Sequence, residues 1–275
     1  MFGLTHPGNV RAENQDHFLL CTIHPQVVVH GTSLPDVGEL PLRGQRLATM
    51  MLVADGVGGA SGGGEAARVA TETITRYVSS TLRCYHTAGS SDEHEFLDAL
   101  RAAAFEAHKA VRADAAEHRA GDLSATTLTL GIVVWPLLYV LQVGDSRCYV
   151  YSGGVLRQVT RDQTVAQSLV DQGLLPADRA RRSPFHNVLA SAIGAEEAKP
   201  EVTRFDLKER GSVVLVCSDG LTKHVKDPEI AEYVAQMKST KQLCNDLLEL
   251  ALSRGGHDNI TIVAGRAPRV RPAIV

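Results

Sequence analysis

The chain has 275 residues, 44% of them hydrophobic and 21% charged, which is ordinary usage for a folded domain and excludes a largely disordered chain. Its 28 Lys and Arg residues against 31 Asp and Glu give a formal charge of −3 at pH 7, so no strong basic field predicts a nucleic-acid partner. The length is sufficient for a sizeable core, and we expect one large domain.

Cysteine usage and apolar runs indicate the compartment. The five cysteines are widely spaced and form no CxxC pair, which argues against a disulfide framework or a thiolate zinc site. The longest apolar stretch, 130–143, contains Gly131 and Pro136 and is shorter than the ~20 residues that a membrane-spanning helix needs. The first residues lack the pattern of a secretory signal. We therefore expect a cytoplasmic protein with no membrane segment.

The first half of the chain predicts a strand followed by two helices. Residues 48–54 form an apolar run that ends at an Asp-Gly pair, the pattern of a buried strand that delivers an aspartate to a glycine-rich loop. Helical spacing of apolar residues predicts a helix over 65–82, and an alanine-rich segment predicts a longer helix over 92–119. The segment 23–46 is rich in Gly and Pro, and we expect an extended hairpin loop there.

The second half predicts mainly strands and then mainly helices. Strands are expected over 126–134, 137–143, 147–151, 155–159, 212–217 and 259–265, and helices over 227–237 and 241–253. Residues 164–194 predict a helix and a loop that carries several arginines, which we interpret as a mobile flap. The segment 267–275 is expected to be a flexible tail. Separate blocks of strands and helices predict an α+β sandwich.

Three aspartates lie at the edges of apolar strands, and these are Asp55, Asp219 and Asp258. An Asp-Gly pair is a common turn, so any one of these sites alone predicts a turn more often than a ligand. Several converging carboxylates would repel one another unless hard divalent cations lay between them. Together the three aspartates therefore predict a site for Mg²⁺ or Mn²⁺.

Six short motifs resemble, in order, those of the metal-dependent protein phosphatase family (PPM, type 2C). They are GNVRAENQD at 8–16, ADGVGG at 54–59, SATT at 124–127, VGDSR at 143–147, CSDGLT at 217–222 and DNIT at 258–261. The resemblance covers nearly the whole chain and is greatest to compact bacterial members. It implies a four-layer α-β-β-α sandwich, with two central, mainly antiparallel sheets flanked by helices, in one domain over residues 1–266.

The resemblance implies a reaction and the residues that perform it. The reaction is hydrolysis of phosphoserine and phosphothreonine on proteins by water activated at a binuclear Mg²⁺ or Mn²⁺ centre. Asp55 would bridge the two metals, the Gly56 carbonyl would bind the second, and Asp219 and Asp258 would complete the first. Arg11 would bind the phosphate, because a planar guanidinium can contact two phosphate oxygens. The implied partners are phosphorylated proteins and a serine/threonine kinase in bacterial signalling.

Other residues receive secondary roles. By the same resemblance, Asp16 would act on the metals through water. Asp145 is interpreted as a structural residue that forms hydrogen bonds in a turn. Asp122 fits two interpretations, an ordinary turn or cap residue and a ligand of a third metal ion. Arg181 and Arg182 in the flap are expected to contact the substrate.

Two departures from the family pattern concern charge and proton transfer. Gln15 stands where many members have Glu, which removes one acidic charge beside the second metal. Val57 follows the first Asp-Gly where some members carry a histidine. The proton for the leaving group would then come from water or from another group. His17 is one candidate, and the alternative is that it is a polar residue at the start of a strand.

Three alternative functions are weighed against this one. The glycine-rich loop has Ser61 where a dinucleotide fingerprint needs glycine, and it has no lysine for a P-loop. A cysteine-based phosphatase needs an arginine six residues after the cysteine, where Cys217 is followed by Lys223 and Cys84 by Ser90. A catalytically weak phosphoprotein-binding regulator on the same fold would have lost metal-binding carboxylates, and all three are retained.

Overall fold

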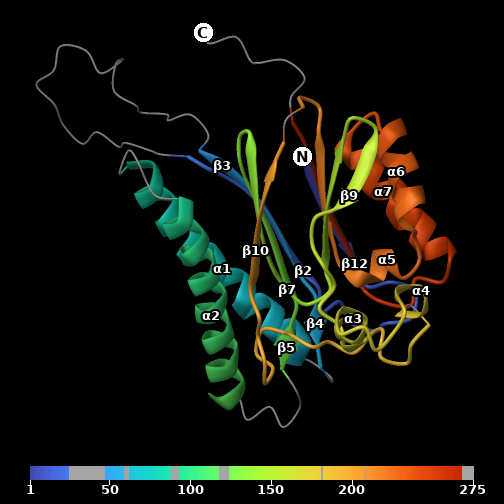
Figure 1. The fold of residues 1–275 in the computed structure, drawn as a ribbon, viewed down its shortest axis with the longest axis horizontal. Coiled ribbons are helices and arrows are strands. Elements are labelled where there is room, and N and C mark those ends of the chain that lie inside the picture. Colours follow the sequence, from blue (N-terminus) through green and yellow to red (C-terminus); the bar gives the residue numbers. More distant parts are fainter. Residues whose placement is uncertain are drawn as a thin grey trace, which may run out of the picture.

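The structure is a computed structural model that describes residues 1–24, 47–58, 62–87, 93–117, 124–180, 182–207 and 209–267. Two β-sheets lie face to face in the centre, and helices cover the outer face of each (Figure 1). This is the four-layer α+β sandwich that the sequence predicted. Asp122, Arg181, most of the expected loop over 23–46 and most of the expected tail lie outside the described residues.

Each central sheet has five strands, and its strand pairs are antiparallel. The first sheet has the order β1 (Phe2–His6), β12 (Ile260–Arg266), β11 (Val213–Cys217), β8 (Arg147–Ser152) and β9 (Val155–Gln158). The second has the order β10 (Glu201–Asp206), β7 (Leu137–Val143), β6 (Leu128–Val134), β3 (Ala48–Ala54) and β2 (His17–Ile23). A small third sheet pairs β4 (Gly56–Val57) with β5 (Ala125–Thr126).

In the described part of the chain, four longer helices form the two outer layers, and three short helices lie in the connecting segments. On the second sheet pack α1 (Gly62–Thr87) and α2 (Glu93–Glu117), and on the first sheet pack α6 (Asp227–Gln236) and α7 (Thr240–Ser253). The short helices are α3 (Val165–Asp171), α4 (Ala177–Ala180) and α5 (Asp219–Thr222). None of the helices in the described ranges is long and apolar enough to cross a bilayer.

The core explains why the central strands are apolar on both faces. In β3, Met50 and Leu52 pack toward α1 and α2, whereas Met51 and Val53 point to the space between the sheets. Alternate residues of a strand face opposite sides, so a strand in the inner layers buries both sets. Every residue of β3 is buried. Its continuous apolar run therefore has a physical cause, and the predicted bounds 48–54 are confirmed.

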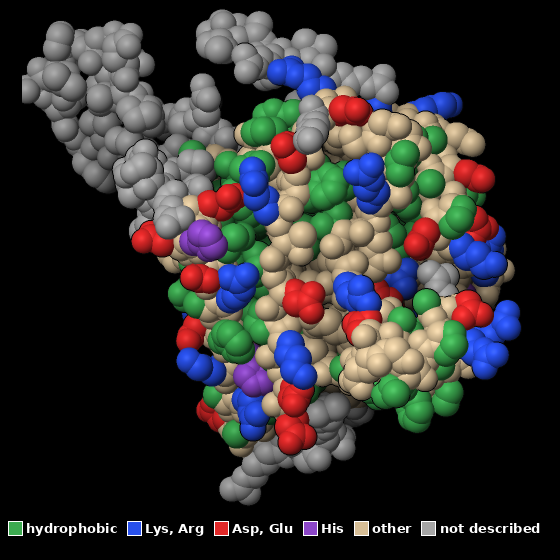
Figure 2. Space-filling model, viewed as in Figure 1, with side chains coloured by type: hydrophobic (Ala, Val, Ile, Leu, Met, Phe, Trp, Pro, Cys, Tyr) green, Lys and Arg blue, Asp and Glu red, His purple; other side chains and the backbone are tan. Residues whose placement is uncertain are grey.

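Several element boundaries differ from the sequence-based expectation. The strand expected over 126–134 is two strands, β5 and β6, which pair in different sheets. The strands β1 and β10, at the edges of their sheets, were not predicted because half-exposed strands carry mixed residues. On the face shown in Figure 2, basic and acidic side chains are interspersed, which agrees with the near-balanced charge.

Candidate metal and phosphate site

The predicted aspartates come together because strands of both sheets end at the same side of the molecule. Asp55 follows β3 of the second sheet, whereas Asp219 follows β11 and Asp258 precedes β12 in the first sheet. All three line one cleft of about 1000 Å³, together with Arg11 and Gly56. The structure thus brings the expected metal ligands and the expected phosphate ligand into one site.

Asp55 is held from its backbone by the SATT segment. Its carbonyl accepts hydrogen bonds from the Thr127 N–H and the Thr126 hydroxyl, both at 2.9 Å. Burial raises the pKa of the Asp55 carboxyl well above its ordinary value, and the nearby carboxylates of Asp16 and Asp219 raise it further. A divalent cation is the partner that relieves both effects, because it compensates for lost hydration and for repulsion.

Gly56 continues this backbone turn in a space that only glycine fits. A Cβ at this position would lie 2.4 Å from the Gly63 carbonyl oxygen and 2.7 Å from the Gln15 carbonyl oxygen. Both contacts are closer than van der Waals distance and both involve backbone. The chain therefore approaches the N-terminal loop closely here, with the Gly56 peptide at the cleft wall.

Asp16 is the most buried acidic side chain of the cluster, with 3% of its surface exposed. Its Oδ2 accepts a hydrogen bond from the Thr261 hydroxyl at 2.7 Å, but its Oδ1 has no partner among the described residues. Burial raises the pKa of Asp16 to about 6, although the Thr261 hydrogen bond opposes the shift. A buried carboxylate oxygen with an open lone pair fits a hydrated divalent cation, and it supports the expected role of Asp16 through water.

Two basic side chains, Lys223 and Arg11, lie among the carboxylates. The Lys223 ammonium is 2.6 Å from Asp219 Oδ2 and 2.8 Å from Asp258 Oδ2. Arg11 donates from Nε to Asp258 Oδ1 at 2.8 Å and from Nη2 to Oδ2 at 3.2 Å. Burial favours a higher pKa for Asp258, but these partners hold its pKa below the ordinary value. Within the described ranges, no three His, Cys, Asp or Glu side chains form a ready ligand group, and Lys223 stands between two of the candidates.

Asn259 fixes the loop that carries Arg11. Its Nδ2 donates to the carbonyl oxygens of Pro7 at 3.0 Å and Glu13 at 2.9 Å, and its Oδ1 accepts from the Gln15 N–H at 2.8 Å. One amide side chain thus satisfies three backbone groups of the N-terminal loop. Asn259 directly follows Asp258, so the candidate ligand Asp258 and the Arg11 loop are positioned next to each other at the start of β12.

Asp145 lines the cleft, a position that the sequence interpretation did not predict. It is 8% exposed, lines the cleft, and has no hydrogen-bond partner for its carboxylate among the described residues. It therefore does not show the turn hydrogen bonds expected of it. Burial and the charge of Asp219 raise the pKa of Asp145 to about 8. The signal was present in the sequence, because Asp145 follows the apolar strand β7 much as Asp55 follows β3.

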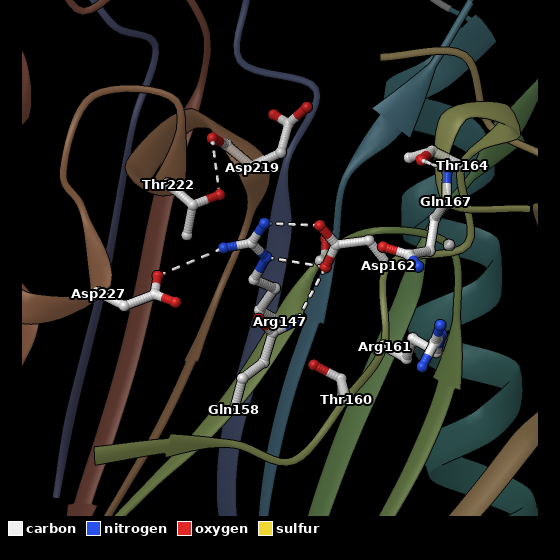
Figure 3. A network of polar contacts seen from close by, with 12 residues as sticks. Arg147, Gln158, Thr160, Arg161, Asp162, Thr164, Gln167, Asp219, Thr222 and Asp227 are labelled. Carbon is white, nitrogen blue, oxygen red and sulfur yellow. Dashed lines mark hydrogen bonds and ion pairs between the residues drawn. The ribbon is translucent and has the colours of Figure 1, made fainter. Parts of the chain in front are cut away.

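Arg147 lies near α5, with its guanidinium between Asp162 and Asp227 (Figure 3). Its guanidinium binds both carboxylate oxygens of Asp162, at 2.8 and 2.6 Å, and lies 3.5 Å from Asp227. Its Nη1 also donates to the Tyr149 hydroxyl at 2.9 Å. Asp162 lies two residues before the predicted flap over 164–194, and Asp227 begins α6. One arginine therefore connects β8 to α6 and to the segment that precedes the flap.

The remaining candidates lie away from the cleft or outside the described residues. The flap lines the cleft with residues 187–192 and not with Arg182, which is exposed. His17 begins β2, pairs with Ala54 and is absent from the cleft lining, and burial lowers the pKa of its imidazole. Lys223 was not predicted, although its position four residues after Asp219 on a short helix places both on one face.

Comparison with known proteins agrees with this geometry. The sequence model of the family described as "Protein phosphatase 2C" matches residues 41–249. The chain belongs to this family. It is 31% identical over 215 residues to the serine/threonine phosphatase stp of Listeria monocytogenes, a match that covers 78% of this chain and 82% of stp. The expected family is thereby confirmed.

A second relative is longer than this chain. The serine/threonine protein phosphatase PstP of Mycobacterium tuberculosis is 31% identical over 216 residues, which are 78% of this chain but only 40% of PstP. A crystal structure of a PstP catalytic domain in complex with two manganese ions has a TM-score of 0.72 and 26% identity, and the match covers 97% of both chains. The four-layer fold predicted for the chain is thus shared with solved phosphatase structures.

Proposed function

We propose that the chain hydrolyses phosphoserine and phosphothreonine on proteins at a centre of two Mn²⁺ or Mg²⁺ ions. The observation that carries the proposal is the meeting of Asp55, Asp219 and Asp258 in one cleft, from strand ends of both sheets, with Arg11 beside them. Membership of the protein phosphatase 2C family and the manganese ions of the related PstP structure support it.

The residues have distinct proposed tasks. Asp55, Asp219, Asp258 and the Gly56 carbonyl would hold the metals, and Asp16 would act through water from its open Oδ1. The bound metals would supply an activated water and neutralise charge on the phosphoryl group. The residues themselves fit oxygen-preferring ions, since the acidic groups of the site are carboxylates and no cysteine or histidine lines the described cleft.

Arg11 is proposed to orient the phosphate. Its guanidinium already binds a carboxylate with two N–H groups and remains 57% exposed, so it is accessible to a phosphate in the cleft. No imidazole lines the part of the cleft that the structure describes. We therefore propose that water supplies the proton for the leaving alkoxide.

The wider setting follows from the same proposal. The substrates would be phosphoproteins produced by a partner serine/threonine kinase in the bacterial cytoplasm. Asp122 and Arg181 lie outside the described residues, so a third metal ion at Asp122 and a substrate contact of Arg181 stay predictions. Arg182 is exposed on the flap, and its substrate contact also stays a prediction.

Phosphate release from a phosphothreonine peptide tests the proposal. Wild-type protein with added Mn²⁺ should release phosphate from the peptide, and excess chelator should abolish this release. Asp219→Asn should lower kcat by several orders of magnitude in a folded protein, because one metal-binding charge is lost. A catalytically weak phosphoprotein-binding regulator is the alternative. It would bind the peptide without releasing phosphate, and that result would overturn the proposal.

A further inference from the structure

Lys223 occupies an unusual place for a basic residue in a metal site. It caps the C-terminus of α5, four residues after Asp219, and its ammonium contacts the carboxylates of both Asp219 and Asp258. These are the two side chains that the proposed function assigns to the first metal. The Lys223 ammonium would therefore compete with a divalent cation for the same two carboxylates.

The surroundings strengthen that competition. The side chains of Asp219 and Asp258 are only 18% and 23% exposed, and that of Lys223 is 30% exposed. Charges in such partly buried places interact more strongly than in bulk water, because the effective dielectric constant is lower. A divalent ion bound by both carboxylates would lie within a few Å of the ammonium. Either the ammonium moves away or it stays and repels the ion, and both outcomes weaken binding.

Arg11 does not duplicate this arrangement. Among the described residues its only ion pair is with Asp258, and its side chain is 57% exposed, so it can leave the carboxylate for solvent or for phosphate. Lys223 instead bridges two carboxylates, one from the start of α5 and one from the loop before β12. The geometry thus separates a substrate-facing cation from a cation placed between the metal ligands.

We propose that Lys223 is a tethered cation that weakens metal binding at the Asp219–Asp258 side of the site by competing for these two carboxylates. The inference rests on the proposed function, because it requires a divalent metal at these carboxylates. It adds that this chain needs a higher free metal concentration for full occupancy than its carboxylates alone would require. It also assigns Lys223 the task of neutralising Asp219 and Asp258 whenever metal is scarce.

Calorimetric titration with Mn²⁺ alone tests the inference without using activity. Lys223→Gln removes the charge and should bind Mn²⁺ about 10- to 100-fold more tightly at one site. Lys223→Arg keeps the charge and should stay close to wild type. Lys238→Gln is the matched control, because Lys238 is exposed, lies outside the cleft, and should leave binding unchanged.

Thermal unfolding provides the second measurement. In chelator Lys223→Gln should melt below wild type, because two carboxylates lose their cation, and with saturating Mn²⁺ the order should reverse. If the variant does not fold in chelator, it is purified with Mn²⁺ and its affinity is measured by chelator competition. Equal or weaker Mn²⁺ binding by Lys223→Gln overturns the inference alone. Absence of Mn²⁺ binding by wild type and variant overturns both the inference and the proposed metal centre.

Discussion

Arg11 is the residue at which substrate binding and metal binding can be separated. It contacts Asp258 but belongs to an exposed loop held by Asn259. Arg11→Ala should raise KM or lower kcat/KM for phosphorylated substrates, whereas Mn²⁺ affinity should change little, since the carboxylates remain. Steady-state kinetics and Mn²⁺ titration measure the two effects. A collapse of Mn²⁺ affinity would show that Arg11 supports the metal site instead of the phosphate.

His17 gives a prediction of no change. The imidazole begins β2, pairs with Ala54 and does not line the cleft. His17→Ala should leave kcat and the pH profile of kcat unaltered, because water and not this side chain is proposed to protonate the leaving group. The profile is measured with saturating phosphopeptide and Mn²⁺. Loss of the acidic or the basic limb of the profile would restore His17 as a proton donor.

The candidate metal ligands that could be predicted from the strand pattern are those at the ends of strands. Asp55, Asp219 and Asp258 could be predicted because each adjoins an apolar strand, and strand ends of the two sheets meet. Lys223 could not be predicted from its neighbours, since its second partner lies 35 residues away in sequence. Asp145 was interpreted as a structural turn residue, although it is buried and lines the cleft.

At the scale of elements, the Arg147–Asp162 pair connects β8 to the segment just before the flap. The two side chains are only 12% and 23% exposed, and both N–H···O bonds are short. Asp162→Asn removes the carboxylate that binds two guanidinium nitrogens, leaves Asp227 at 3.5 Å as the remaining charge partner of Arg147, and should lower the free energy of unfolding by about 3 kcal/mol. Urea denaturation measures this loss.

The exposed pair of Arg101 and Asp98 on α2 is the matched control for that prediction. Its side chains are 42% and 74% exposed, so Asp98→Asn should change the free energy of unfolding by no more than ~0.5 kcal/mol. Similar losses for Asp162→Asn and Asp98→Asn would show that the Arg147–Asp162 pair is not a special support of the segment before the flap.

The start of α6 carries a pH-dependent contact with the end of α7. Glu229 accepts a hydrogen bond from the Lys226 N–H at 3.0 Å and forms an ion pair with Arg254. Chiefly through Arg254, the pKa of Glu229 is lowered to about 2. Because the folded pKa is depressed, the stabilisation is complete above the ordinary glutamate pKa and is lost as pH falls toward 2.

Glu229→Gln should therefore lower Tm at pH 7, and the difference from wild type should shrink as the pH falls from about 4.5 toward 2. Thermal unfolding followed by circular dichroism across this range measures the trend. A Tm difference that stays constant with pH would mean that the hydrogen bond to the α6 backbone, and not the charge, is the source of the effect.

Helices and strands were predicted correctly where burial sets the pattern of apolar residues. They were missed where only pairing with a neighbouring strand defines the element. The strand β3 is buried on both faces and reads as one apolar run, and the helices α6 and α7 show helical spacing. The edge strand β10 is largely exposed, with polar and apolar residues that fit a loop equally well. Only its register with β7, from Glu201 opposite Gln142 onward, makes it a strand.

At the scale of the whole molecule, the cleft joins two sheets that otherwise meet through an apolar layer. The residues of that layer include Met51 and Val53 from one sheet and Val216 and Val263 from the other. At one end of this layer the contacts between the sheets become carboxylates that repel one another. Divalent cations bound there would thus link the sheets as well as supply the chemistry. Stability and metal loading should be coupled.

Asp55→Asn separates these two consequences. In chelator at pH 8 the variant should melt above wild type, because one carboxylate is removed from a buried cluster that includes Asp16 and Asp219. Wild type should gain stability with Mn²⁺ according to mass action, about 2.7 kcal/mol per site at a free concentration 100 times Kd, whereas the variant should gain far less. Differential scanning calorimetry in chelator and in a Mn²⁺ series measures both curves. A variant that melts below wild type in chelator would mean that Asp55 contributes native contacts that outweigh its repulsion. An undiminished Mn²⁺ gain would mean that Asp55 does not hold the metals that join the two sheets.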